Sequence, residues 1–288
     1  MRLITRADLD GITCGVLISI AASIDRFMFV EPKMIQDGEV AVESGDIIAN
    51  LPYHPNCRLW FDHHVTNRIS EAFEGRFEVA PSAARVVFDF YAHPDFGAYA
   101  ELMAETDRID SGMLEMADIL RPDRYVLLSF TLTPGNPADE PYWTKLIGLL
   151  RERPFCEVMA DKEVQCRCRQ VVDDFNDYRQ VLLKHSRREG NIVITDLRGC
   201  DFKGRENRFL VYTLFPETNV SLKIFRDSSH TERCGISAGK NIFNKTCKLN
   251  LGELMVRYGG GGHDGAASCR VPDEAVARSV AGMIRALN

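Results

Sequence analysis

The sequence lacks the features typical of membrane, secreted and zinc-finger proteins. Its longest apolar stretch, from Gly11 to Ile24, is too short to span a bilayer. Acidic residues already occur at Asp8 and Asp10, where a signal peptide would be apolar. The nine cysteines are scattered and odd in number, without a CxxC pair, so they indicate neither a disulfide framework nor a zinc site. We therefore expect a cytoplasmic protein without a membrane partner.

The sequence also has no excess of positively charged residues. The formal net charge is -6, from 35 Lys and Arg against 41 Asp and Glu. This balance does not indicate a broadly basic nucleic-acid surface, so we do not expect duplex DNA as a partner. A local basic patch would still suit a short anionic substrate. The composition is otherwise ordinary, and 288 residues are enough for two modest domains.

Short β-like runs alternate with helix-like stretches in the first hundred residues. We expect strands at 2–5, 27–30, 46–50 and 58–61, and helices at 12–23 and 83–92, with Ser82 as an N-cap. This alternation predicts an α/β fold in which helices flank a parallel sheet. In such folds the chemistry gathers at the carboxyl ends of the strands.

The pattern changes in the second half of the chain. Residues 101–184 have a helical pattern, and a polar, glycine-containing segment at 185–191 marks a domain boundary. Beyond it we expect strands at 192–195, 209–214, 220–225, 233–238 and 266–271, with helices at 251–258 and 273–287. We therefore predict a domain at 1–185, a linker at about 186–190, and a smaller α/β domain with a mixed sheet at 191–288. A cleft is expected between the two domains.

Metal-competent side chains follow several of the predicted strands. Asp8 and Asp10 lie one residue apart at the end of the first strand, and carboxylates suit hard divalent cations. An isolated Asp-x-Asp is also typical of a solvated turn. The run Asp62-His63-His64 follows an apolar strand, and three such side chains are costly to bury unsatisfied. A surface histidine pair is the alternative, and Asp110 is a further acidic candidate.

A run of four glycines precedes His263 near the end of the chain. Glycines let a backbone approach a ligand closely and present successive N–H groups to an anion. His263 would add a donor for phosphate or carboxylate. The predicted substrate-binding residues are Gly260, Gly261, Gly262 and His263, with Lys240, Asn244 and Lys245.

Four motifs in order resemble the DHH phosphoesterase superfamily and its C-terminal DHH-associated domain. They are Asp8-x-Asp10, Asp62-His63-His64, Asp110-Ser-Gly112 and the glycine run ending at His263. The resemblance covers nearly the whole chain. The chain is especially similar to bacterial sequences called exopolyphosphatase-related or oligoribonuclease-like, because it shares the stretches 50–53 and 81–85 with them.

This resemblance implies a metal-dependent phosphohydrolase, with Mn(II) as the metal or Mg(II) as the alternative. Family substrates include short RNA oligomers, nucleotide bisphosphates, cyclic dinucleotides, polyphosphate and single-stranded DNA. The resemblance also implies in-line attack by water on the phosphate, with a metal that lowers the pKa of that water and neutralises developing charge. The implied metal ligands are Asp8, Asp10, Asn50, Asp62, His63 and Asp110, and the implied catalytic residues are Asp62, His64 and Arg6.

Two positions depart from the family pattern. Many relatives have a histidine at the position of Ile4 or Arg6, and an aspartate that bridges two metals at the position of Asn50. We therefore expect one metal ion, with the fixed charge of Arg6 standing in for a cation toward phosphate. The alternative is a phosphate- or nucleotide-binding protein of the same fold that has lost catalysis. The oligomeric state is open.

Overall fold

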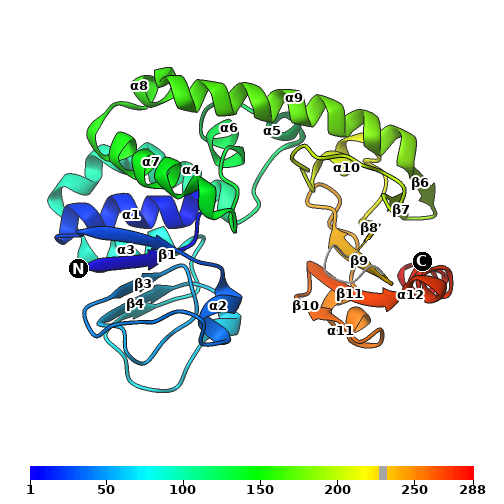
Figure 1. Cartoon of the computed structure of the whole chain (residues 1–288), viewed down its shortest axis with the longest axis horizontal. Helices are drawn as coiled ribbons and strands as arrows, with labels where there is room; N and C mark the ends of the chain where they lie inside the picture. The colour runs from blue at the N-terminus through cyan, green and yellow to red at the C-terminus, as the bar shows by residue number, and fades with distance from the viewer. Residues whose placement is uncertain (227–231) are drawn as a thin grey trace. The chain divides into compact units, whose positions relative to one another are not determined.

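The computed structural model describes residues 1–226 and 232–288 (Figure 1). The chain forms two compact units, each described by itself below. The first contains Met1–Leu114 and Pro122–Arg169, and the second contains Glu115–Arg121 and Gln170–Asn288. The long helix α9 (Lys162–His185) contributes to both. Residues 186–189, which we expected in a linker, instead form strand β6 (Ser186–Glu189), paired with β7 (Ile192–Asp196). The assignment of separate functions to two domains stays a prediction.

The first unit is built on a five-stranded sheet in which every pairing is parallel. The strand order is β2-β1-β3-β4-β5. The strands are β1 (Arg2–Thr5), β2 (Arg26–Phe29), β3 (Ile47–Ala49), β4 (Leu59–Asp62) and β5 (Gly75–Phe77). The predicted parallel α/β fold is confirmed, although the short strand β5 was not expected.

Helix α1 (Leu9–Ala21) is buried along most of its length and packs against both the sheet layer and α7 (Glu140–Glu152). A Cβ at Gly15 would lie 2.5 Å from Cδ1 of Ile147, so glycine is needed for this close approach. The other helices of this unit are α2 (Pro32–Gln36), α3 (Ala83–Tyr91), α4 (Ala100–Asp110), α6 (Arg124–Phe130) and α8 (Phe155–Ala160). Figure 1 shows α1 and α3 beside the strands and α7 next to α1.

The second unit contains a six-stranded mixed sheet, as expected. Its order is β10-β11-β9-β8-β7-β6, with β7 and β8 parallel and the other neighbours antiparallel. The remaining strands are β7 (Ile192–Asp196), β8 (Val220–Arg226), β9 (Arg233–Lys240), β10 (Gly261–Gly262) and β11 (Ala266–Pro272). The helices are α5 (Met116–Leu120), α10 (Leu210–Leu214), α11 (Leu251–Val256) and α12 (Val276–Leu287).

The strand predicted at 209–214 is wrong, because Leu210–Leu214 form α10 and Phe209 is the N-cap residue of that helix. Periodicity cannot separate a short buried helix from a buried strand, since both are continuous apolar runs. The tertiary contacts decide it here: the hydroxyl of Tyr212 bonds Ser221 and the carbonyl of Gly239, which lie on β8 and β9. Among the described residues, no helix is both long enough and apolar enough to cross a membrane.

Candidate active site

The predicted site residues of the first unit lie where parallel strands end. Arg6 and Asp8 follow β1, Asn50 follows β3, and Asp62 is the last residue of β4. These three strands are neighbours in the sheet, so their carboxyl ends meet at one edge. Asn50 has φ of 59°, a left-handed conformation that asparagine tolerates better than most residues. The chain turns there, and its side chain reaches Asp8.

Three side chains converge as one candidate metal site: Asp10, His63 and Asp110. Nε2 of His63 lies 3.3 Å from Oδ2 of Asp110 and 3.8 Å from Oδ2 of Asp10. One ligand atom from each residue falls within 4.8 Å of the others. Nitrogen and oxygen donors in this number suit Mn(II) or Mg(II) better than a soft metal. Asp62, His63 and His64 form a second group within the same limit.

The hydrogen bonds of His63 leave its Nε2 atom ready for a cation. Nδ1 lies 3.0 Å from the carbonyl oxygen of Ala80, which can only accept, so Nδ1 carries the proton. Nε2 then presents a lone pair, and it is buried without a hydrogen-bond partner among the described residues. A backbone carbonyl on the other ring nitrogen is how metal-binding histidines are commonly oriented. The residues therefore fit a divalent metal.

The two carboxylates of this group are costly to ionise without a cation. Asp10 is 1% exposed, and burial together with the charge of Asp8 raises the pKa of Asp10 to about 7. Burial and the charges of Asp10 and Asp8 raise the pKa of Asp110 to about 8. Like charges in a poorly solvated site disfavour ionisation, and a bound metal ion reverses this effect.

Helix α3 holds Asp10 in place. The backbone N–H groups of Ala83 and Ala84 donate to the two oxygens of Asp10 at 2.9 and 2.7 Å. These groups belong to the first turn of α3, whose N–H groups lack partners within the helix. The carboxylate also benefits from the positive end of the helix dipole.

The start of α3 is itself anchored by residues that the sequence analysis did not assign to the site. Ser82 caps the helix by accepting from the N–H of Arg85, and it donates to Oδ1 of Asp107 at 2.7 Å. Arg85 donates to Oδ2 of Asp107 through both Nε and Nη2, at 3.0 and 2.6 Å. The sequence signals for this network were the N-cap at Ser82 and the family-like stretch 81–85, and neither identifies a partner 25 residues away.

Asp8 is surrounded by donors rather than by other ligands. Its Oδ2 accepts from Nη1 of Arg6 at 2.9 Å, and Oδ1 accepts from the amide of Asn50 at 2.9 Å and the N–H of Gly11 at 3.0 Å. Arg6 also binds Oε2 of Glu31 through Nε at 3.3 Å. Burial alone would lower the pKa of Arg6, but the charges of Asp8 and Glu31 raise it above its ordinary value. A permanent cation therefore lies beside Asp8.

His64 is oriented by Asp62. Nδ1 of His64 lies 2.8 Å from Oδ1 of Asp62, and Asn67 donates to Oδ2 at 2.7 Å. Burial would lower the pKa of His64, but the hydrogen bond to Asp62 and its charge outweigh burial and raise it. The imidazole side chain is 47% exposed, whereas Asp62 is fully buried. His64 can therefore donate a proton or a hydrogen bond to a bound anion.

In the second unit, the structure brings Lys240 to the glycine run. Nζ of Lys240 lies 2.7 Å from Oδ1 of Asp264, and the backbone N–H of Lys240 donates to the carbonyl of Gly265. Asn244 lies further along, where its amide donates to the carbonyl of Glu217 at 3.2 Å, and Lys245 is exposed. The predicted substrate-binding residues thus occupy the end of β9, the loop after it, and β10 with the residue on either side of it.

Glycine is required at two positions of the run because the neighbouring strand leaves no room for a side chain. A Cβ at Gly260 would lie 2.1 Å from the carbonyl oxygen of Ser268, and one at Gly262 would lie 2.5 Å from Cα of Ala267. The N–H groups of Gly259, Gly260 and His263 donate to protein carbonyls. These three N–H groups are therefore not free to bind an anion.

Comparison with known proteins gives a likeness over the full length of the chain. The pGpG-specific phosphodiesterase PggH from Vibrio cholerae has 31% sequence identity and a TM-score of 0.86, over 100% of this chain and 98% of that one. RecJ from Thermus thermophilus, solved with Mn2+, has 13% identity and a TM-score of 0.59. The match covers 99% of this chain but only 52% of RecJ, and at this identity it shows the fold alone. No family model matches, and no curated protein does.

The fold and the full-length relative define a hydrolytic enzyme of the phosphoesterase class. The chain belongs to the DHH phosphoesterase superfamily, as its motifs predicted.

Proposed function

We propose that this enzyme cleaves the phosphodiester bond of very short oligonucleotides and that a linear dinucleotide such as pGpG is its substrate. The 31% identical relative, which matches over its full length, is described as specific for pGpG. The net charge of -6 also disfavours a long polyanion. The convergence of Asp10, His63 and Asp110 carries the proposal, because this arrangement fits a metal ion that polarises a phosphate.

The metal in this proposal is one Mn(II) or Mg(II) ion held by Asp10, His63 and Asp110. When bound, it would lower the pKa of water and neutralise charge on the phosphate. Asp8 and Asn50, also predicted as ligands, bond to each other, and Asp8 bonds to Arg6. We assign Asp8 to hold Arg6, whose guanidinium supplies a second positive charge for phosphate.

His64 and Asp62 act as a pair in the proposed reaction. Nδ1 of His64 is held by Asp62, which leaves Nε2 to donate to a phosphate oxygen or to the leaving oxygen. We assign Asp62 as a positioning residue for the imidazole, because its Oδ1 holds Nδ1 of His64 while Oδ2 accepts from Asn67. In the second unit, we propose Lys240, Asn244, Lys245 and His263 as phosphate-binding residues.

The second candidate function is that of a nucleotide-binding protein that has lost catalysis. This candidate is considered because Asn50 stands where many relatives have an aspartate that bridges two metals. Turnover of pGpG, pApA and a nucleotide bisphosphate should be measured with Mn(II), for the wild type and His63→Ala. We expect dinucleotide cleavage by the wild type and a loss of at least about 10²-fold in the variant. Tight dinucleotide binding without turnover of any of the three would contradict the enzyme and favour the binding protein.

A further inference from the structure

Two threonines join helices α1 and α4 by a hydrogen bond in the interior of the first unit. Oγ1 of Thr13, on α1, lies 2.8 Å from Oγ1 of Thr106, on α4, and both residues are fully buried. Thr106 donates its single hydroxyl proton to the carbonyl of Leu102 at 2.8 Å. In the contact between the two hydroxyls, Thr13 is therefore the donor and Thr106 the acceptor.

Each threonine lies one helical turn from a proposed metal ligand on its own helix. Thr13 is three residues after Asp10 on α1, and Thr106 is four residues before Asp110, the last residue of α4. Residues three or four apart lie on the same face of a helix, about 5 Å from each other along its axis. The hydrogen bond therefore joins the two helix faces that carry Asp10 and Asp110.

The carboxylate of Asp110 depends on the position of α4. In the described part of the chain no group donates a hydrogen bond to this carboxylate, and its Oδ2 lies 3.3 Å from Nε2 of His63. Asp10, by contrast, is held by two backbone N–H groups of α3. A shift of α4 along α1 would therefore move Asp110 relative to both Asp10 and His63.

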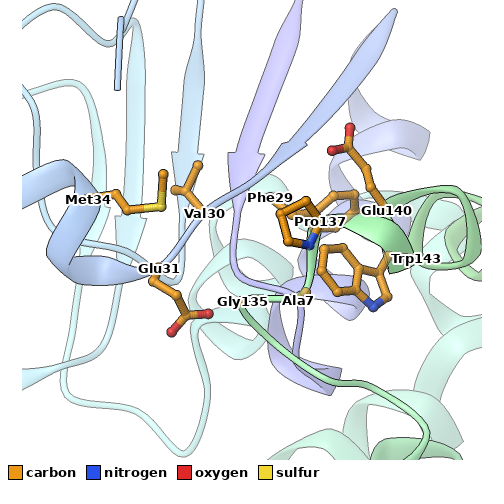
Figure 2. Close-up of a pocket in the computed structure, with 9 residues that line it drawn as sticks. All are labelled: Ala7, Phe29, Val30, Glu31, Met34, Gly135, Pro137, Glu140 and Trp143. Carbon is orange, nitrogen blue, oxygen red and sulfur yellow. The ribbon is translucent and has the colours of Figure 1, made fainter. Parts of the chain in front are cut away.

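Apolar packing around the start of α1 does not by itself fix this arrangement. Ala7, two residues before α1, lines a cavity of about 100 Å³ together with Phe29 and Trp143 (Figure 2). The packing on that side is therefore incomplete. Apolar contacts are also non-directional, whereas a buried polar pair with satisfied hydrogen bonds favours a single arrangement of the helices that carry it.

We propose that Thr13 and Thr106 form a positioning pair, whose hydrogen bond sets the separation of Asp10 and Asp110 for the metal ion. The proposal rests on the metal site of the proposed function and extends it to two residues that are not ligands. Thr13→Val and Thr106→Val test it, because valine replaces the hydroxyl with a methyl group and keeps the branched shape of the side chain.

Thr13→Val removes the hydrogen bond between the helices and leaves the bond from Thr106 to Leu102 in place, so no buried donor loses its acceptor. We expect this variant to weaken Mn(II) binding by about 10- to 100-fold in calorimetry, the typical effect of removing a group that orients a metal ligand. Thr106→Val should weaken binding as well. The double variant should bind no more weakly than the weaker of the two, because the same hydrogen bond is lost in all three. Thr13→Ser keeps the hydroxyl and should bind Mn(II) as the wild type does.

Thr131→Val is the matched control for a merely structural role. Thr131 is also fully buried, and its hydroxyl lies 2.6 Å from that of Tyr142, on α7, and donates to the carbonyl of Leu128. No proposed metal ligand lies on α7. We expect Thr131→Val and Thr13→Val to lower the guanidinium midpoint of unfolding alike, but only Thr13→Val to lower the Mn(II) affinity of the folded protein. Should Thr106→Val fail to fold, the comparison of Thr13→Val with Thr13→Ser decides.

The outcomes separate this pair from the proposed reaction. If Thr13→Val binds Mn(II) as tightly as the wild type, or if Thr131→Val weakens binding equally, the positioning pair is refuted and the metal site stands. If the wild type binds no Mn(II), the metal site is refuted and the pair with it. If Mn(II) affinity depends on Thr13 but no dinucleotide is cleaved, the reaction is refuted and the pair stands.

Discussion

Nε2 of His63 and Oδ2 of Asp110 lie 3.3 Å apart, although the two residues come from different parts of the chain. Their approach brings a lone pair and a carboxylate together in a poorly solvated site. A proton on Asp110 relieves the repulsion in the metal-free protein, and a divalent cation would replace that proton. Metal affinity should therefore depend on pH, through the proton on Asp110. It should also depend on the position of α4, which ends at Asp110.

His63→Ala should abolish tight metal binding, because it removes the one nitrogen ligand of the group. We expect the wild type to bind one equivalent of Mn(II) in a calorimetric titration and the variant to bind none tightly. His185→Ala, at the end of α9, is a control with the same change of side chain. Unchanged Mn(II) binding by His63→Ala would show that the metal lies elsewhere.

Changing Arg6 to His and Asn50 to Asp together should create a second metal site. The double variant removes the guanidinium that neutralises Asp8 and adds a nitrogen and an oxygen ligand around it. We expect the Mn(II) stoichiometry to rise from one to two. A wild type that already binds two equivalents would contradict the role given to Arg6.

Arg6→Ala alone should lower kcat by about 10²-fold, the typical effect of removing one charge-stabilising donor. The metal stoichiometry should stay at one, since Arg6 is not a ligand. Arg26→Ala is the control, because Arg26 pairs with Glu43 on the surface. Steady-state kinetics on the cleaved dinucleotide measure both variants.

Asp107→Asn should weaken metal binding, although Asp107 is not one of the proposed metal ligands. The change removes the charge that holds Ser82 and Arg85 at the start of α3, and α3 orients Asp10. Partners behind metal ligands are typically worth about 10- to 100-fold in metal affinity. Glu105→Gln, in the same helix, should change affinity little because Glu105 bonds only to Arg108 among the contacts described. Equal Mn(II) affinities in the two variants would refute this coupling.

Metal affinity should rise with pH between about 6 and 8. The pKa values of Asp10 and Asp110 are raised to about 7 and about 8, so both carboxyls hold protons at low pH and must release them to bind a cation. Affinity is thus lost as pH falls through these values, by up to about tenfold per pH unit for each proton displaced. Calorimetry in buffers of different ionisation enthalpy would count the protons. An affinity that is constant from pH 6 to 8 would contradict these shifts.

The sequence by itself determined the architecture and the kinds of residue in the site. Alternating short apolar runs and helical stretches predicted the parallel sheet, because hydrophobic periodicity is a local property that one chain carries. The ordered motifs, with Asp62-His63-His64 the strongest of them, predicted the superfamily. The run at 209–214 was misread because a short apolar segment has no period that separates helix from strand.

Only the tertiary structure decided which of these residues meet. Asp10 accepts from Ala84, 74 residues further on. The sequence predicted where α3 begins, but it did not show that the first turn of α3 would meet Asp10. Asp8 meets Arg6 and Asn50 rather than the metal group, and Asp107 supports α3 from another helix. Pairings of this kind depend on strand order and helix packing, which bring distant residues together. Local sequence specifies the elements, whereas the partners of each side chain follow from how those elements pack.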